Sequence, residues 1–77
     1  MSDRLAEIAA SVFELEPSQI NDALSPEQVS AWDSFAHVML ITQIEETLNV
    51  RFDPKELTTF KTIGDIRAQL RKRGVTV

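Results

Sequence analysis

The sequence predicts an all-α protein, a small antiparallel four-helix bundle with three main helices and one short helix. Apolar residues recur at spacings of three and four, which is the period of one helical face. Capping residues precede the predicted helices, and no segment alternates between apolar and polar residues as a half-buried strand would. The 77 residues, 43% of them hydrophobic, suffice for one modest core. We therefore expect residues 1–77 to form a single domain.

The first helix is expected over about residues 3–15. Ser2 or Asp3 can cap its start, and Pro17 prevents continuation far beyond its end. Its apolar stripe comprises Leu5, Ile8, Val12 and Leu15.

Residues 16–33 form a long connection rich in Ser, Asn, Asp, Gln and Pro. Within it, Ser25-Pro26-Glu27-Gln28 has the pattern of a capping box with proline at the first helical position, which predicts a single helical turn. Loops this long are often functional in small domains. The residues expected to hold the connection to the core are Ile20, Leu24 and Val29.

The second helix is predicted to follow the cap residue Asp33 and to run from Ser34 to Leu48, with Asn49 at its end. Its apolar stripe comprises Phe35, Val38, Ile41, Ile44 and Leu48, widened by Leu40. The opposite face comprises Ala36, Met39, Gln43 and Glu46.

Two further helices are predicted in the last third of the chain. Asp53-Pro54-Lys55-Glu56 starts a short helix of one or two turns. Thr62 and Asp65 form a capping pair at the start of the last helix, and Gly74 ends it. The apolar stripe of the last helix comprises Ile63, Ile66 and Leu70.

Composition excludes several classes of function. Residues 1–60 hold eleven acidic and three basic residues, so general nucleic-acid binding is not expected. The basic residues Arg71, Lys72 and Arg73 are expected in the last helical turn, where the macrodipole favours cations. No apolar run is long enough to span a bilayer. We expect a cytoplasmic protein with no membrane partner.

Catalytic and metal chemistry find little support. The chain has no cysteine and a single histidine, His37, which cannot form a metal site alone. Ser34 and His37 stand three residues apart on one helix, but at an open helix end with no evident oxyanion hole or orienting group. Glu45 and Glu46 are interpreted as solvated charges. With only two glycines, a glycine-rich nucleotide loop is absent.

The remaining candidate is the junction Ala31-Trp32-Asp33-Ser34-Phe35. Ser34 stands at the first helical position, where its hydroxyl would be exposed beside the free N–H groups and positive dipole end of the helix. A phosphodiester on that hydroxyl would have its charge in a favourable place. Taken alone, Asp33-Ser34 fits an ordinary helix cap better than an attachment site.

Asp33-Ser34-Phe35, followed by Val38, Leu40, Ile41, Ile44 and Glu45-Glu46, resembles the Asp-Ser-Leu signature and second helix of acyl carrier proteins. The resemblance extends to the first helix, the long loop, the short helix after Phe52-Asp53-Pro54 and the last helix after Thr62-Ile63-Gly64-Asp65. It thus covers nearly the whole chain.

The resemblance implies that a phosphopantetheinyl transferase attaches 4'-phosphopantetheine from coenzyme A to Ser34, with Asp33 recognised as part of the motif. The arm ends in a thiol that carries acyl groups as thioesters. The chain itself would catalyse nothing. Its partners would be acyl-activating, condensing or acyl-transferring enzymes, and the carrier is expected to be a monomer.

In this family, partner enzymes commonly recognise acidic residues along the second helix. The matching docking surface here is expected to comprise Asp33, Ala36, Met39 and Glu46. Ala36 and Met39 stand where fatty-acid carriers usually have acids, so docking should depend more on apolar contact. The segment from Trp32 to His37 is similar to that of stand-alone carriers in specialised pathways, for polyketide-like, secondary-metabolite or surface-polysaccharide products.

In carriers, an acyl chain can enter between the second and third helices. The residues expected in the core there, and around such a pocket, are Phe35, Val38, Ile41, Phe52, Leu57, Phe60 and Ile63. The pair Phe52 and Phe60 would narrow the pocket and favour short or polar cargo. Trp32 is expected to pack over the core, although it could also shape the docking surface. His37 is expected to face outward, as an exposed histidine or a contact for the arm's phosphate.

Two alternatives remain open at this stage. The chain could be a helical interaction module that keeps the fold without an arm. It could instead be a peptidyl carrier in an amino-acid-activating system.

Overall fold

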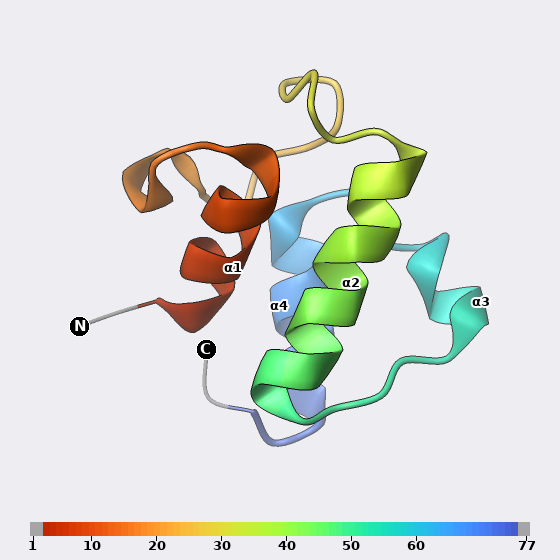
Figure 1. The fold of residues 1–77 in the computed structure, drawn as a ribbon. Helices are drawn as coiled ribbons and strands as arrows, with labels where there is room; N and C mark the ends of the chain where they lie inside the picture. Colours follow the sequence, from red (N-terminus) through yellow and green to blue (C-terminus); the bar gives the residue numbers. More distant parts are fainter. Residues whose placement is uncertain (1–2, 76–77) are drawn as a thin grey trace.

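A computed structural model of the chain describes residues 3–75 and confirms the all-helical prediction. It contains α1 (Arg4–Phe13), the 3-10 helix η1 (Pro17–Gln19), α2 (Ser34–Leu48), α3 (Pro54–Leu57) and α4 (Ile63–Lys72). In Figure 1, α1 and α3 lie on opposite sides of α2, α4 lies behind α2, and α1 runs against the direction of α2. Within residues 3–75, no helix has the length and apolar character needed to cross a bilayer.

The caps of α1 and α4 act as predicted. Asp3 caps α1 by accepting a hydrogen bond from the Ala6 N–H at 3.1 Å, whereas Ser2 lies outside the described residues. α1 ends at Phe13, two residues earlier than expected, because Glu14 adopts a left-handed conformation with φ of 58°. Thr62 and Asp65 form the predicted capping box of α4.

The core contains buried apolar residues from α1, α2, α4 and the connections, and the half-buried Leu57 of α3 packs against it. On α1 the most buried positions are alanines and Phe13, whereas Ile8, Val12 and Leu15 of the predicted stripe are only partly buried. The buried apolar residues are Leu5, Ala6, Ala9, Ala10, Phe13, Ile20, Val29, Trp32, Ala36, Leu40, Ile41, Ile44, Phe52, Phe60, Ile63, Ile66 and Leu70. The alanines let neighbouring elements approach α1 closely.

The long connection contains two similar turns, of which the sequence predicted one. Residues 25–28 form a hydrogen-bonded turn rather than the expected helical turn, with the Gln28 N–H donating to the Ser25 carbonyl at 3.0 Å. The unpredicted turn is η1, which the Glu16-Pro17-Ser18-Gln19 segment forms. In both segments the glutamine side-chain oxygen accepts from the backbone N–H three residues earlier, so the same X-Pro-X-Gln pattern marks both.

A buried arginine joins this connection to α4 and to the start of α1. Arg67 on α4 is paired with Asp3 at 2.8 Å and with Asp22 at 2.7 Å. The Asp22 carbonyl also accepts from the Gly64 N–H at 2.9 Å, and a Cβ at Gly64 would lie 3.0 Å from that oxygen. Hydrogen bonding to Arg67 lowers the pKa of Asp3 below its ordinary value, despite the opposing effect of burial. The cluster joins the start of α1, the loop and α4.

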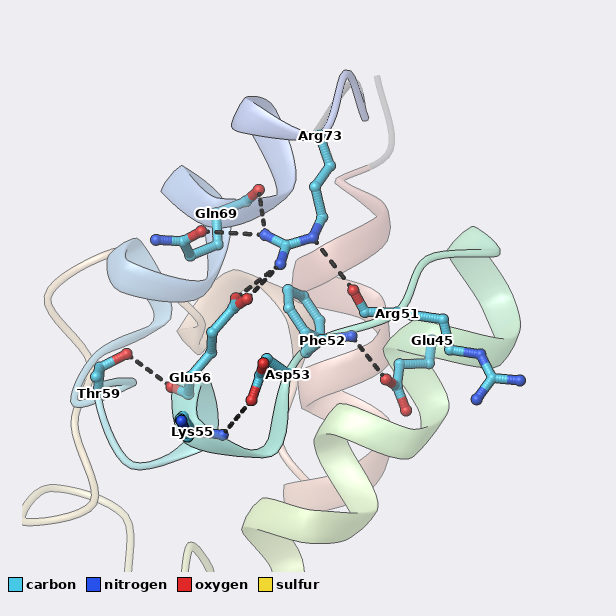
Figure 2. A network of polar contacts seen from close by, with 9 residues as sticks. All are labelled: Glu45, Arg51, Phe52, Asp53, Lys55, Glu56, Thr59, Gln69 and Arg73. Atoms are coloured by element: carbon cyan, nitrogen blue, oxygen red, sulfur yellow. Dashed lines mark hydrogen bonds and ion pairs between the residues drawn. The ribbon is translucent and has the colours of Figure 1, made fainter.

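Arg73 forms a second cluster at the other end of α4 (Figure 2). Its guanidinium donates to both carboxylate oxygens of Glu56 on α3, at 2.6 and 2.8 Å, and lies 4.8 Å from the centre of the Phe52 ring. It also donates to the Arg51 carbonyl and to Gln69. Arg73 therefore fastens α3 and its preceding loop to α4.

Two charge predictions are corrected by this cluster. Arg71 and Lys72 lie in the last turn of α4 as expected, but Arg73 lies one residue beyond it and forms tertiary contacts. Glu45 is half-buried and its carboxylate accepts from the Phe52 N–H at 2.9 Å, so it is not a solvated charge. Glu46 is exposed, as expected. The Phe52 N–H lies in the loop between α2 and α3, outside any helix, and the Glu45 carboxylate supplies its hydrogen-bond acceptor.

We predict that Asp3→Asn lowers the free energy of unfolding by about 1 kcal/mol at neutral pH, since the pair is partly solvated. The pKa of Asp3 is lower in the folded chain than its ordinary value, so this stabilisation is present above about pH 4 and disappears as the pH falls through the folded value. Urea unfolding at neutral and acidic pH measures it. Glu27→Gln in the exposed loop serves as the control, with no expected change. A difference between wild type and Asp3→Asn that stays constant down to acidic pH would contradict the pairing.

Candidate functional site

The start of α2 is defined by one capping hydrogen bond. The Asp33 carboxylate accepts from the Ala36 N–H at 2.8 Å, and the Asp33 carbonyl accepts from the His37 N–H at 2.9 Å. Ser34 is therefore the first residue of α2, as predicted, and it is exposed. Trp32 before it and Ala36 after it are both buried, so the Asp33–Phe35 segment must project from the surface.

A groove of about 600 Å³ lies between this helix start and the α3 region. Its lining is mainly apolar, with the hydroxyl-bearing Ser34 among the polar members. The lining residues are Pro26, Trp32, Asp33, Ser34, His37, Val38, Leu57, Thr58 and Phe60. The predicted attachment residue thus borders a groove that reaches the residues at the end of α3.

Trp32 and His37 form a bridge across one wall of this groove. The Trp32 indole packs against Phe13 with ring centres 4.9 Å apart, which confirms the predicted packing over the core. Its Nε1 donates to His37 Nδ1 at 3.0 Å. His37 Nε2 lies 2.9 Å from the Leu57 carbonyl oxygen. The prediction of an outward, exposed His37 is wrong, because the side chain is half-buried and contacts two other elements.

The faces of α2 differ from the predicted faces. Phe35 and Val38, expected in the core, are 73% and 55% exposed, whereas Ala36, expected at the surface, is only 8% exposed. Met39 is exposed, as predicted. The buried stripe comprises Ala36, Leu40, Ile41 and Ile44. α2 has apolar residues on both faces, so the three- and four-residue spacing that assigned Phe35 to the core did not identify the buried face.

Comparison with known protein families supplies a match over most of the chain. Residues 3–70 match a family described as the phosphopantetheine attachment site. The chain belongs to this family. A comparison with curated protein sequences finds no match. Members of the family are sites of covalent 4'-phosphopantetheine attachment and are generally non-catalytic carriers. The resemblance to acyl carrier proteins is thereby confirmed, and a role with phosphopantetheinyl transferases and biosynthetic enzymes follows in general terms.

The residues at the start of α2 suit the phosphodiester of a phosphopantetheine group. The first turn of a helix presents backbone N–H groups and the positive end of the macrodipole, and Ser34 stands in that turn. The Asp33 carboxylate is engaged with the Ala36 N–H. The groove beside Ser34 has mainly apolar walls with a few polar groups. A flexible arm could pack against the apolar walls and form hydrogen bonds from its amides to the polar groups.

The seven residues predicted around an acyl pocket fall into three groups. Val38, Leu57 and Phe60 line the groove. Ile41, Phe52 and Ile63 are buried in the core, as expected, and are not among the lining residues of the groove. Phe35 is exposed and likewise lies outside that lining, and Leu57 is half-buried. Phe52 and Phe60 pack edge to face with ring centres 5.3 Å apart.

A Ser34–His37 catalytic pair is not formed. A serine nucleophile needs a base nitrogen within hydrogen-bonding distance. Here Nδ1 accepts from Trp32 and Nε2 is engaged with the Leu57 carbonyl. Within residues 3–75, no three His, Cys, Asp or Glu residues are grouped so that they could hold a metal ion.

We predict that Phe35→Ser changes the free energy of unfolding by less than about 0.5 kcal/mol, because the ring is mostly solvated. Leu40→Ala, on the buried stripe of the same helix, should cost about 2–5 kcal/mol. Chemical denaturation of the two variants and wild type tests the assignment of faces. Equal losses in the two variants would show that Phe35 belongs to the core.

Proposed function

We propose that Ser34 is the phosphopantetheine attachment point and that the chain is an acyl carrier which catalyses no reaction itself. The observation that supports this most strongly is the exposed Ser34 at the capped start of α2, beside the groove, inside a family match over residues 3–70. The arm supplies a terminal thiol that holds acyl groups as thioesters, in a chain that has no cysteine.

Each residue near Ser34 has a distinct part in this proposal. Ser34 supplies the hydroxyl, and its position in the first turn stabilises the negative charge of a phosphodiester. Asp33 keeps the helix start in place through the Ala36 N–H and is the neighbour that a transferase would recognise. Val38, Leu57 and Phe60 offer apolar surface on which the arm can rest.

The docking surface proposed for partner enzymes follows the exposed face of α2. It keeps Asp33, Met39 and Glu46 from the sequence prediction, loses the buried Ala36 and gains the exposed Phe35 and Val38. A partner that acts on the arm must approach this surface, since Ser34 adjoins it. The surface is largely apolar near Ser34, so partner affinity should depend on apolar burial more than on charge steering.

The same composition supports a role in a specialised pathway. Fatty-acid carriers usually show acids at the positions of Ala36 and Met39, and this chain has none there. We therefore place the chain with stand-alone carriers for polyketide-like, secondary-metabolite or surface-polysaccharide products, whose partners are acyl-activating, condensing or acyl-transferring enzymes. A peptidyl carrier differs only in the group carried.

The proposed cargo is short or polar. A long acyl chain that entered the core past Phe60, which lines the groove, would have to separate Phe60 from Phe52, and Phe52 is also covered by Arg73. Glu56 on α3 is fastened by the same arginine, which opposes movement of α3 away from the core. Cargo should therefore remain in the open groove or in solvent.

We predict that incubation with coenzyme A, magnesium and a broad-specificity phosphopantetheinyl transferase increases the intact mass by one phosphopantetheine group. Ser34→Ala should show no increase. Ser30→Ala, in the exposed loop, is the matched control and should be loaded as wild type is. No gain in the wild type, or a gain that persists in Ser34→Ala, would contradict the proposal and favour an arm-less interaction module.

We predict that a dodecanoyl group on the arm leaves the methyl NMR signals of Ile41 and Ile63 where a short acetyl group leaves them. Both side chains are buried, and neither lines the groove beside Ser34. Phe60→Ala is the comparison variant, in which the longer chain should shift these signals because space becomes available. Large shifts in the wild type with the dodecanoyl group would show that long cargo enters the core.

A further inference from the structure

The bridge formed by Trp32, His37 and Leu57 determines the protonation of the imidazole. A tryptophan Nε1 can only donate a hydrogen bond, so the His37 Nδ1 that faces it at 3.0 Å must be an acceptor without a proton. A backbone carbonyl can only accept, so Nε2, at 2.9 Å from the Leu57 oxygen, carries the proton. The geometry therefore requires the neutral ring in its Nε2–H form.

The bridge joins three parts of the groove wall. Trp32 belongs to the loop before α2, His37 to α2 and Leu57 to α3, and all three line the groove with Ser34. The Trp32 and His37 rings are also stacked, with centres 6.0 Å apart. Trp32 is 4% exposed, so the loss of its acceptor leaves a buried donor unpaired.

We propose that His37 is a positioning residue that holds Trp32 and the end of α3 as the walls of the groove beside Ser34, and that it holds Trp32 only while its ring is neutral. A proton on Nδ1 removes the acceptor for Trp32, whereas Nε2 can still donate to Leu57. Protonation of His37 would therefore release the indole from its acceptor. The effect on the arm rests on the function proposed above, whereas the bridge belongs to the unmodified chain.

Among the residues that line the groove, Asp33 is the only other titratable side chain, and its carboxylate caps the Ala36 N–H. From α3, Glu56 is held by Arg73, and Asp53 accepts from the Lys55 N–H. On the loop side, Trp32 contacts the uncharged Phe13 of α1. The variant Asp33→Asn separates any titration of Asp33 from that of His37.

The test uses NMR of the unmodified chain, which contains one histidine and one tryptophan, so both signals are unambiguous. Between about pH 8 and pH 5, long-range proton–nitrogen spectra report which imidazole nitrogen is protonated, and the indole N–H signal reports Trp32. We expect the Nε2–H form at the alkaline end. The Trp32 signal should then shift with the same midpoint as the imidazole, in wild type and in Asp33→Asn.

Two variants separate the two hydrogen bonds. His37→Asn places an amide oxygen near the position of Nδ1 and cannot titrate, so the Trp32 signal should stay constant with pH at its bridged position. His37→Gln reaches the position of Nε2 and leaves Trp32 without an acceptor. Its Trp32 signal should stay at the position that wild type reaches in acid. If His37→Gln does not fold, the wild-type and His37→Asn titrations decide the question.

The proposal is overturned if the alkaline form carries its proton on Nδ1, if the imidazole titrates without moving the Trp32 signal, or if His37→Asn shows the same pH response as wild type.

A consequence for the arm is measured after loading. Because the sequence has no cysteine, the arm's thiol is the single thiol, and its reaction rate with a disulfide reagent reports its exposure. The ratio of wild-type to His37→Asn rates should change with pH in step with the imidazole. A constant ratio would remove the effect on the arm, and failure to load would overturn only the proposed function.

Discussion

The hydrogen bond from the Ala36 N–H to the Asp33 carboxylate is the constraint on which the candidate site depends. It begins α2 at Ser34 and sets the rotation at which the helix leaves the loop. Ala36 then faces the core, and Ser34 and Phe35 face solvent. The same rotation brings His37 under the Trp32 indole and against the Leu57 carbonyl. One cap thereby determines which hydroxyl is available and which side chains surround it.

Two arginines on or just after α4 support this arrangement from a distance. Arg67 binds Asp22 in the long connection and Asp3 at the start of α1. These ion pairs restrict the conformations of the connection that leads to Trp32. Arg73 binds Glu56 and covers Phe52, so it limits the movement of α3 on the other side of the groove (Figure 2). The long connection and α3, which carry the two walls of the groove, are thus both bound to α4 or to the residue that follows it.

The sequence predicts those features that depend on local contacts. The caps at Asp33 and Thr62, the proline start of α3 and the end of α4 at Gly74 all involve residues within four positions, and all are confirmed. The sequence does not predict which face of α2 is buried, because that depends on which other elements pack against the helix. Ala36 is buried although it is small, and no local pattern reveals which face of the helix its tertiary neighbours cover.

The missed role of His37 has the same origin. Its partners are five and twenty residues away, and the second is a backbone carbonyl that leaves no trace in the amino-acid pattern. The η1 turn, by contrast, could have been predicted, since Glu16-Pro17-Ser18-Gln19 repeats the pattern of Ser25-Pro26-Glu27-Gln28. Arg73 could not, because a charge near a helix end also satisfies the macrodipole without any tertiary partner.

The central claim is that the arm is attached to Ser34, and peptide mass spectrometry of the loaded protein tests it most directly. Cleavage after glutamate releases the segment from Gln28 to Glu45, in which Ser30, Ser34 and Thr42 carry the hydroxyl groups. Fragmentation of that segment distinguishes the three. The account predicts the phosphopantetheine mass on fragments that contain Ser34 and its absence from fragments with Ser30 or Thr42 alone. Attachment at either of those residues, or outside the segment, would contradict it.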